Sequence, residues 1–171
     1  MIRTTQPEGQ GQADAQHATP NQVAAGMERF PGRCREAGLA DTVQRRAIYG
    51  ALLESSDHPT AEALHDRVKR RLPSVSLATV YRNLRLFADA GIVEEVATGS
   101  SFARYDANMR PHHHLICRGC GCVTDCYSSK FDSVVAAGSE LDEFEVHDAK
   151  VNLYGLCRTC RQHNKDVTED K

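Results

Sequence analysis

The stretch that decides the architecture of this chain is residues 112–126, with the sequence HHHLICRGCGCVTDC. It holds three histidines, four cysteines and one aspartate within fifteen positions. On a β-strand, side chains alternate between faces, which places His112 and His114 on one face and His113 on the other. A turn and a second strand would then bring Asp125 close to the first two histidines. The stretch therefore predicts two paired strands that carry metal ligands of two chemical kinds.

Cysteine partners for this stretch lie near the other end of the chain. The motif Cys117-x-x-Cys120 pairs naturally with Cys157-x-x-Cys160. Two such motifs provide four thiolates, the coordination that structural zinc prefers. The residues before the first helix contain no apolar leader, so seven cysteines in this chain favour metal binding over disulfides. We therefore predict one structural zinc ion bound by these four cysteines.

Three further cysteines leave their roles open. Cys122 and Cys126 could be reduced bystanders, a substitute ligand or an oxidisable pair, and Cys34 is most simply a small buried residue. The histidines raise a separate question, because their nitrogens together with a carboxylate suit Fe²⁺ or Mn²⁺ better than a thiolate site does, although zinc also fits. A histidine run is as often a plain surface feature as a ligand set. A ligand role for His112 and His114 therefore needs support from elsewhere in the chain.

Upstream of this stretch, helical periods alternate with breaks. A 3.6-residue apolar period predicts helices, two of which begin after the capping residues Thr60 and Ser76. Two β-prone runs around Thr98 predict a hairpin. The predicted helical segments are residues 28–39, broken near Pro31, then 41–56, 60–72 and 76–91, and the hairpin spans residues 92–106. Three short helices followed by a hairpin predict a winged helix-turn-helix.

The helix over residues 76–91 is the candidate for reading DNA. A reading helix must present polar and aromatic groups opposite its apolar stripe, so that arginine can bind guanine edges and tyrosine can contact thymine methyl groups or phosphates. In an isolated helix such residues would form only a solvated face. Here the helix precedes a wing, which favours DNA binding through a local surface, since the net charge of −2 gives no domain-wide basic character. The outward residues are Thr79, Tyr81, Arg82, Asn83 and Arg85.

Composition divides the chain into segments. Residues 1–25 are rich in Gln, Ala, Thr, Pro and Gly, which predicts a mobile tail. No apolar run is long enough to cross a bilayer, so we expect a soluble, cytoplasmic protein without a membrane partner. The fold class is α+β, with a winged-helix domain at 26–106, a hinge at 107–111 and a small α/β domain at 112–165. In the last domain we expect strands at 115–117, 123–126 and 145–154 and a helix at 130–141.

Four motifs together resemble the ferric uptake regulator (Fur) family of bacterial metal-dependent repressors. In chain order they are HPTAEAL, SLATVYRNL, HHHLICRGCG and LYGLCRTC, within a similarity that runs from about residue 39 to 160. The resemblance implies a winged helix joined by a hinge to an α/β dimerisation domain with structural zinc. It implies a homodimer that binds a double-stranded DNA operator, with Tyr81 and Arg82 at the base-contacting positions. The two CxxC pairs match the family's zinc ligands.

The resemblance also implies a regulatory site for Fe²⁺ or Mn²⁺. The matching residues are His58, Asp106, His112, His114 and Asp125. Peroxide sensors of the family, which resemble PerR, have aspartate at the position of Asp125, where iron sensors typically have glutamate. We therefore expect a peroxide-sensing repressor in which His58 and His112 match the oxidised ligands. The alternative within the family is a Fur-type repressor that responds to iron.

The sequence also departs from the family pattern. A basic residue common ahead of the T-x-Q-R motif is Ala40 here, followed by Asp41, which weakens the case for a minor-groove contact. Cys122 and Cys126 are unusual, and only His113 and Asp132 could serve a further metal site.

Other classes of protein fit less well. A zinc hydrolase or deaminase needs a general-base glutamate in a motif such as H-x-E or HExxH, and neither occurs, so we expect no enzyme. A structural zinc-ribbon module that does not bind DNA would explain the CxxC pairs. It would leave the reading helix and His58 without a role.

Overall fold

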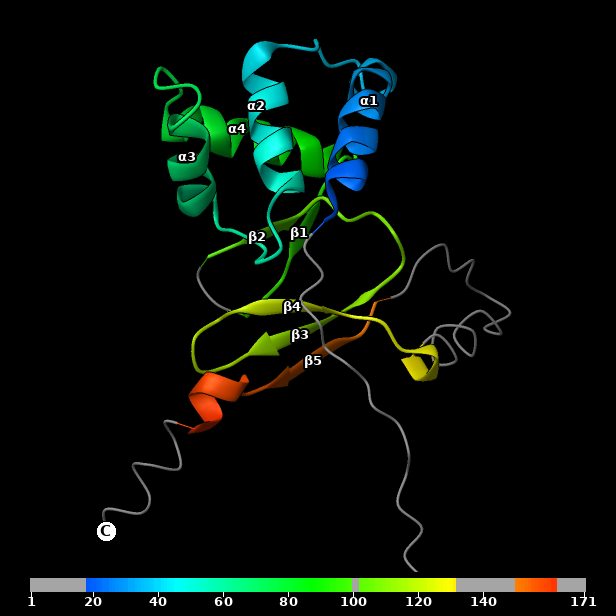
Figure 1. The fold of residues 1–171 in the computed structure, drawn as a ribbon, viewed down its shortest axis with the longest axis vertical. Helices are drawn as coiled ribbons and strands as arrows, with labels where there is room; N and C mark the ends of the chain where they lie inside the picture. Colours follow the sequence, from blue (N-terminus) through cyan, green and yellow to red (C-terminus); the bar gives the residue numbers. More distant parts are fainter. Residues whose placement is uncertain (1–17, 100–101, 132–149, 163–171) are drawn as a thin grey trace, which may run out of the picture.

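The computed structural model describes residues 18–99, 102–131 and 150–162 of the 171-residue chain. The longer helices gather at one end of the molecule and two small sheets lie below them (Figure 1). These helices are α1 (Pro20–Glu36), α2 (Val43–Leu53), α3 (Ala61–Lys69) and α4 (Leu77–Asp89). The strands are β1 (Glu94–Val96), β2 (Arg104–Asp106), β3 (His113–Cys117), β4 (Val123–Cys126) and β5 (Asn152–Gly155). None of these helices is both long and apolar enough to span a membrane.

Helix α1 differs from its prediction at its start and in its middle. It begins at Pro20, because Thr19 accepts the N–H of Gln22 while the Gln22 side chain accepts the N–H of Thr19. The predicted tail, residues 1–25, is therefore too long by the first turns of this helix. The predicted break near Pro31 is also wrong. Phe30 and Cys34 are fully buried, and their packing keeps the helix continuous although Pro31 lacks a backbone N–H to donate.

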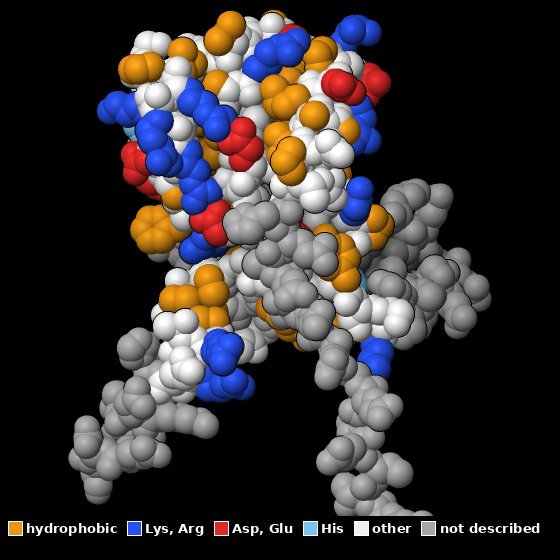
Figure 2. All heavy atoms as spheres, in the orientation of Figure 1, with side chains coloured by type: hydrophobic (Ala, Val, Ile, Leu, Met, Phe, Trp, Pro, Cys, Tyr) orange, Lys and Arg blue, Asp and Glu red, His pale blue; other side chains and the backbone are white. Residues whose placement is uncertain are grey.

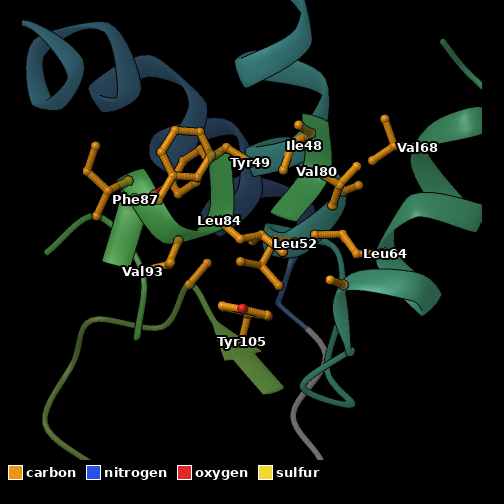
Figure 3. Close-up of a cluster of buried hydrophobic side chains, with 14 of the residues drawn as sticks. Ile48, Tyr49, Leu52, Leu64, Val68, Val80, Leu84, Phe87, Val93 and Tyr105 are labelled. Atoms are coloured by element: carbon orange, nitrogen blue, oxygen red, sulfur yellow. The ribbon is translucent and has the colours of Figure 1, made fainter. Parts of the chain in front are cut away.

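The helices enclose one apolar core (Figure 3). At its centre the ring of Phe30 stacks on Tyr49 at 4.5 Å and meets Phe87 edge-on at 5.6 Å. Aliphatic side chains from α2, α3 and α4 surround these rings, and Tyr105 of β2 joins them from the wing. The core thus fixes the wing to the helices, and the winged helix-turn-helix architecture is as predicted.

The wing brings two distant segments to one place. Strands β1 and β2 pair antiparallel, with Glu94 opposite Asp106. The Tyr105 N–H donates to the carbonyl of Pro59, 3.1 Å away, which ties β2 to the loop between α2 and α3. This bond places the loop residue His58 beside the end of β2, where Asp106 lies.

The lower sheet has the strand order β4-β3-β5, with β3 antiparallel to β4 and parallel to β5. Its register places His114 opposite Asp125. The described contacts between this sheet and the wing include a small cluster of Val96, Ile116 and Val123, an ion pair between Lys150 and Glu94, and a hydrogen bond from the Tyr154 hydroxyl to the Ala97 carbonyl. The predicted helix at 130–141 and the first part of the strand predicted at 145–154 lie mostly outside the described residues.

Candidate metal centres

The four predicted zinc ligands come together at one end of the lower sheet. Cys117 ends β3, Cys120 lies in the following turn, Cys157 directly precedes the helical turn after β5, and Cys160 lies within that turn. Their sulfur atoms all lie within 4.8 Å of one another. Gly119 makes room for this approach, because a Cβ there would lie 2.9 Å from the Cys160 sulfur.

Backbone donors prepare this cysteine cluster for a cation. The N–H of Cys157 donates to the Cys117 sulfur at 3.2 Å and lowers the pKa of that thiol to about 6. A side-chain hydrogen bond with Cys157 instead raises the pKa of Cys160 to about 12, because a thiol that donates to a neighbouring sulfur keeps its proton. Four convergent sulfur donors match the tetrahedral preference of Zn²⁺. The chemistry of the residues fits structural zinc.

The remaining cysteines are separated from one another. Cys34 is fully buried in α1, as expected for a small buried residue. Cys122 precedes β4 and Cys126 ends it, so at the strand rise of roughly 3.3 Å per residue their Cα atoms are about 13 Å apart. A disulfide needs Cα atoms within about 7 Å. An oxidised Cys122–Cys126 pair therefore requires β4 to come apart.

The five predicted regulatory ligands also come together, and they come from both parts of the molecule. His58 belongs to the loop between α2 and α3, and Asp106 ends β2. His112 and His114 lie at the start of β3, and Asp125 lies on β4. One ligand atom from each lies within 4.8 Å of all the others. His113 points elsewhere and accepts the Val151 N–H through Nδ1, which agrees with the predicted alternation.

The distances between these atoms are those of a shared cation site. His58 Nε2 lies 2.8 Å from Asp125 Oδ1 and 3.7 Å from Asp106 Oδ2. His112 Nε2 lies 3.0 Å from Asp106 Oδ2 and 2.9 Å from His114 Nε2. The other ring nitrogen of His112 donates to the Arg110 carbonyl at 2.7 Å, which leaves Nε2 with its lone pair directed into the cluster.

Several atoms of this histidine–aspartate cluster are buried without a hydrogen-bond partner. Among the described residues they are both ring nitrogens of His58, Asp106 Oδ2 and Asp125 Oδ1. The short His58–Asp125 approach does not have hydrogen-bond geometry. Buried polar atoms without partners are costly, so a set of them directed at one point fits the ligands of a cation. Imidazole nitrogens and carboxylate oxygens suit Fe²⁺ or Mn²⁺.

Electrostatics of the cluster agree with a cation site. Burial alone would lower the pKa of His58, but the carboxylates of Asp106 and Asp125 offset it and raise that pKa to about 9. Burial also acts to raise the pKa of each aspartate, and the facing histidines outweigh it, so that both carboxyl groups titrate below their usual range. In the absence of metal, a proton on His58 supplies part of the positive charge that a cation would supply to the carboxylates.

The backbone at His58 is held in an uncommon conformation. Its φ of 46° lies in the left-handed region, and within the described residues no other non-glycine side chain has a positive φ. Arg104 of β2 donates to the His58 carbonyl at 2.8 Å, and Arg67 of α3 forms a bidentate pair with Asp57. Strain of this kind persists only where its surroundings impose it, and these two arginines hold the loop. Sequence patterns gave no sign of either contact.

A cleft of about 910 Å³ reaches the histidine–aspartate cluster from solvent. It lies between α1 and the segment 107–110, within the predicted hinge, and its lining includes His58, Asp106, Asn108, Asp125 and Tyr127. Small molecules can therefore approach the ligands although most of them are buried.

The predicted reading helix is α4, and four of its five predicted residues lie toward solvent. Tyr81, Arg82 and Arg85 are exposed and Thr79 is partly exposed, with the Tyr81 hydroxyl bonded to Glu62. The outward placement predicted for Asn83 is wrong. Its side chain is 7% exposed, accepts from Arg45 Nε at 3.0 Å and donates to the Thr79 carbonyl at 2.8 Å. Asn83 therefore ties α4 to α2.

Basic side chains gather over α3, with acidic neighbours among them (Figure 2). Arg67 pairs with Asp57 at 2.6 Å and Arg71 pairs with Glu54 at 2.7 Å. These pairs fit a solvated face over residues 67–71.

Comparisons with known proteins agree on one family. The model of the ferric uptake regulator family matches residues 36–154. The peroxide-responsive repressor PerR of Staphylococcus epidermidis is 38% identical over 136 residues, which cover 80% of this chain and 91% of that protein. The ferric uptake regulator of Pseudomonas aeruginosa with manganese is 28% identical, with a TM-score of 0.65 over 74% of this chain and 96% of that one. A Campylobacter jejuni peroxide stress regulator is 26% identical, with a TM-score of 0.63 over 78% and 98% of the two chains.

Proposed function

This chain belongs to the ferric uptake regulator family, and from that premise we propose that it is a metal-dependent, DNA-binding transcriptional repressor that senses peroxide. It acts in the cytoplasm as a homodimer on a double-stranded operator. The cysteine cluster holds structural zinc, and the histidine–aspartate cluster holds regulatory Fe²⁺ or Mn²⁺. Similarity to peroxide-responsive repressors over four fifths of the chain supports peroxide as the signal and a regulator rather than an enzyme as the class.

One observation carries this proposal: the histidine–aspartate cluster is assembled across the hinge. His58 and Asp106 come from the helical part with its wing, whereas His112, His114 and Asp125 come from the lower sheet. A cation bound by all five fixes one part against the other. The reading helices of a dimer must meet successive major grooves, so fixing this orientation favours DNA binding.

Coupling of this kind is reciprocal. If metal stabilises the arrangement that binds DNA, then DNA must tighten metal binding by the same factor. At the operator, Arg82 binds a guanine edge and Tyr81 packs on thymine or bonds a phosphate. Both side chains are exposed on α4.

Peroxide acts through the ligands themselves. Fe²⁺ held by these histidines and aspartates would supply the electrons that reduce hydrogen peroxide close to the imidazole rings. The cleft admits the oxidant, and His58 and His112 lie next to the carboxylates that hold the cation. A histidine that gains an oxygen atom binds metal poorly, so the two parts separate and the repressor leaves its operator.

A binding titration tests the proposal. The full chain, zinc-loaded and otherwise metal-free, is titrated with Fe²⁺, Mn²⁺ or Zn²⁺ against an operator duplex selected from a random library, before and after hydrogen peroxide. We expect Fe²⁺ and Mn²⁺ to confer operator binding, and peroxide to abolish it for the iron form alone. The manganese form is the matched control, because it has the same ligands without the redox chemistry.

Mass spectrometry of the peroxide-treated iron form identifies the route. One added oxygen on His58 or His112 supports the proposal. A Cys122–Cys126 disulfide with unmodified histidines would replace it with a thiol switch, reversible by reductant, in which β4 opens. Iron-dependent operator binding with no modification at either place would make the protein an iron-responsive repressor.

A further inference from the structure

Asn108 in the hinge contacts both carboxylates of the histidine–aspartate cluster. Its backbone N–H donates to Asp106 Oδ1 at 2.8 Å. Its side-chain Nδ2 donates to Asp125 Oδ2 at 2.7 Å and to the Tyr127 hydroxyl at 2.6 Å. That hydroxyl in turn donates to Asp125 Oδ2 at 3.1 Å. One hinge residue thus joins the carboxylate of the wing to the carboxylate of β4.

The orientation of the Asn108 amide is set by its surroundings. Its Oδ1 accepts the Arg110 N–H at 3.3 Å, so the nitrogen must face Asp125 and Tyr127. The same Arg110 supplies the carbonyl that fixes the His112 ring. Three ligands of the cluster are therefore oriented from one short segment of hinge.

These contacts divide the oxygens of each carboxylate into two roles. Asp106 Oδ1 and Asp125 Oδ2 are the oxygens that receive hydrogen bonds. Asp106 Oδ2 and Asp125 Oδ1 are the buried oxygens without partners, and both face the histidine nitrogens. The hinge occupies the outer oxygen of each aspartate, which leaves one inner oxygen of each for the cation.

We propose that Asn108, acting with Tyr127, is a positioning residue that holds Asp125 as a one-oxygen ligand and thereby sets the affinity and coordination number of the regulatory site. The proposal deepens the function proposed above and rests on it. Without the amide, the outer oxygen of Asp125 is free to turn toward the cation, or the whole carboxylate is free to leave it. Groups that orient metal ligands typically change affinity by about 10- to 100-fold.

Of the two residues that bond Asp125 Oδ2, Tyr127 makes the longer hydrogen bond. Its ring is 54% exposed and lines the cleft, and its centroid lies 5.8 Å from that of His112. Removing the hydroxyl while keeping the ring therefore tests the hydrogen bond without opening the cleft.

The test compares Asn108→Leu, Tyr127→Phe and the double variant with the unchanged full chain, all zinc-loaded. Asn108→Leu keeps the backbone N–H that holds Asp106 but removes both the bond to Asp125 and the bond from the Arg110 N–H. Tyr127→Phe removes only a bond to Asp125 and the bond from Asn108, so it tests the Asp125 contact without disturbing Arg110. Tyr154→Phe is the matched control, because Tyr154 is also half exposed and its hydroxyl bonds the Ala97 carbonyl away from the cluster. Affinity for Mn²⁺ is measured without DNA by competition with a chelator, and Co²⁺ absorption reports the coordination.

We expect Asn108→Leu to lose about 10- to 100-fold in Mn²⁺ affinity and to change the Co²⁺ d–d spectrum. Tyr127→Phe should lose less, and the double variant should lose less than the product of the two, because both residues bond the same oxygen. Zinc content, and the melting temperature before Mn²⁺ is added, should stay at the values of Tyr154→Phe. A purely structural role would lower that melting temperature and leave the Co²⁺ spectrum of the folded fraction unchanged.

Two failures are distinguishable. If the unchanged chain binds Mn²⁺ but Asn108→Leu and Tyr127→Phe bind it equally well with the same Co²⁺ spectrum, the positioning role is refuted and the proposed function stands. If the unchanged chain binds no Mn²⁺, or if His112→Ala binds it as well as the unchanged chain, both are refuted. If Asn108→Leu fails to fold, the Mn²⁺ affinity and Co²⁺ spectrum of Tyr127→Phe test the positioning role, because this change removes one oxygen atom from an exposed side chain.

Discussion

The two clusters of this molecule differ in where their ligands come from. All four cysteines belong to the lower sheet and the turns at its end. The histidines and aspartates come from a loop between two helices, from the wing and from two strands of the lower sheet. The first cluster closes one part of the chain on itself, and the second joins two parts.

This difference determines what the protein loses when each metal is removed. A cation whose ligands lie within one domain contributes to the folding of that domain, so its loss is a loss of structure. A cation whose ligands lie in two domains contributes to their relative orientation, so its loss changes what the folded protein can bind. The donor atoms agree with this division, because thiolates hold zinc tightly and the mixed nitrogen and oxygen set suits exchangeable Fe²⁺ or Mn²⁺.

The largest effect is expected from Cys157→Ser. Structural zinc contributes on the order of 10 kcal/mol to folding, and a hydroxyl cannot replace this thiolate. We expect loss of zinc, of the lower domain's cooperative melting transition and of the dimer, measured by metal analysis, calorimetry and sedimentation. Cys126→Ser is the matched control and should retain all three. Zinc retention with an unchanged melting curve in Cys157→Ser would remove the distinction between the clusters.

His112→Ala should break the second cluster alone. We expect operator binding to lose its dependence on Mn²⁺, while zinc content and the melting temperature of the metal-free protein stay close to those of the unchanged chain. His113→Ala is the matched control, because that ring lies on the opposite face of β3 and accepts the Val151 N–H. If operator binding by His112→Ala still depended on Mn²⁺, the histidine–aspartate cluster would not be the regulatory site.

The metal-free form should depend on pH through His58. Its pKa is raised from 6.5 to about 9 in the folded state, so its stabilising contribution is complete below pH 6.5 and is lost as pH rises through 9. The aspartates have lowered pKa values and do not titrate in this window. Burial acts to lower the pKa of His112, but Asp106 outweighs it and raises that pKa as well, so the share of His58 is the part that His58→Asn removes. The loss is at most about 3 kcal/mol at 1.36 kcal/mol per pKa unit. Urea unfolding of the zinc-loaded, Mn²⁺-free protein below pH 6.5 and above pH 9 measures this loss. The free energy of unfolding of His58→Asn should decline less between the two conditions.

A substitution outside both clusters, at Arg82, separates DNA contact from metal binding. Arg82→Ala should weaken operator binding by roughly 1–3 kcal/mol and relax preference at one base pair, if the guanidinium binds a guanine edge. Both metal contents should be unchanged. Binding to operator variants by fluorescence anisotropy is the measurement. A uniform loss across all sequences would instead make Arg82 a phosphate contact.

The smallest effect is expected from Arg104→Gln. This change removes the hydrogen bond that holds the His58 carbonyl, worth about 1 kcal/mol. We expect a several-fold loss in Mn²⁺ affinity and no change in zinc content, measured by chelator competition. Arg71→Gln, which breaks an exposed pair with Glu54, is the control. Equal losses in both variants would mean that the loop conformation at His58 does not depend on Arg104.

Spacing and alternation along the chain were enough to identify much of this molecule. Two CxxC motifs predict a four-cysteine cluster, because each motif places two sulfurs at one turn whatever the rest of the fold. The two-residue period of a strand separates His113 from His112 and His114 for an equally local reason. Thr60 and Ser76 mark helix starts because a capping side chain bonds the backbone three residues ahead.

Other features follow only from contacts between distant residues. Asn83 has the helical position of an outward side chain but lies inside, because Arg45 of α2 binds it. Helix α1 continues through Pro31 because its neighbours in the core hold Phe30. Asn108 and Tyr127 carry no motif, and their role depends on the fold that brings hinge and β4 together. Periods and motifs lie in neighbouring residues, whereas a hydrogen-bond partner far along the chain is chosen only by tertiary packing.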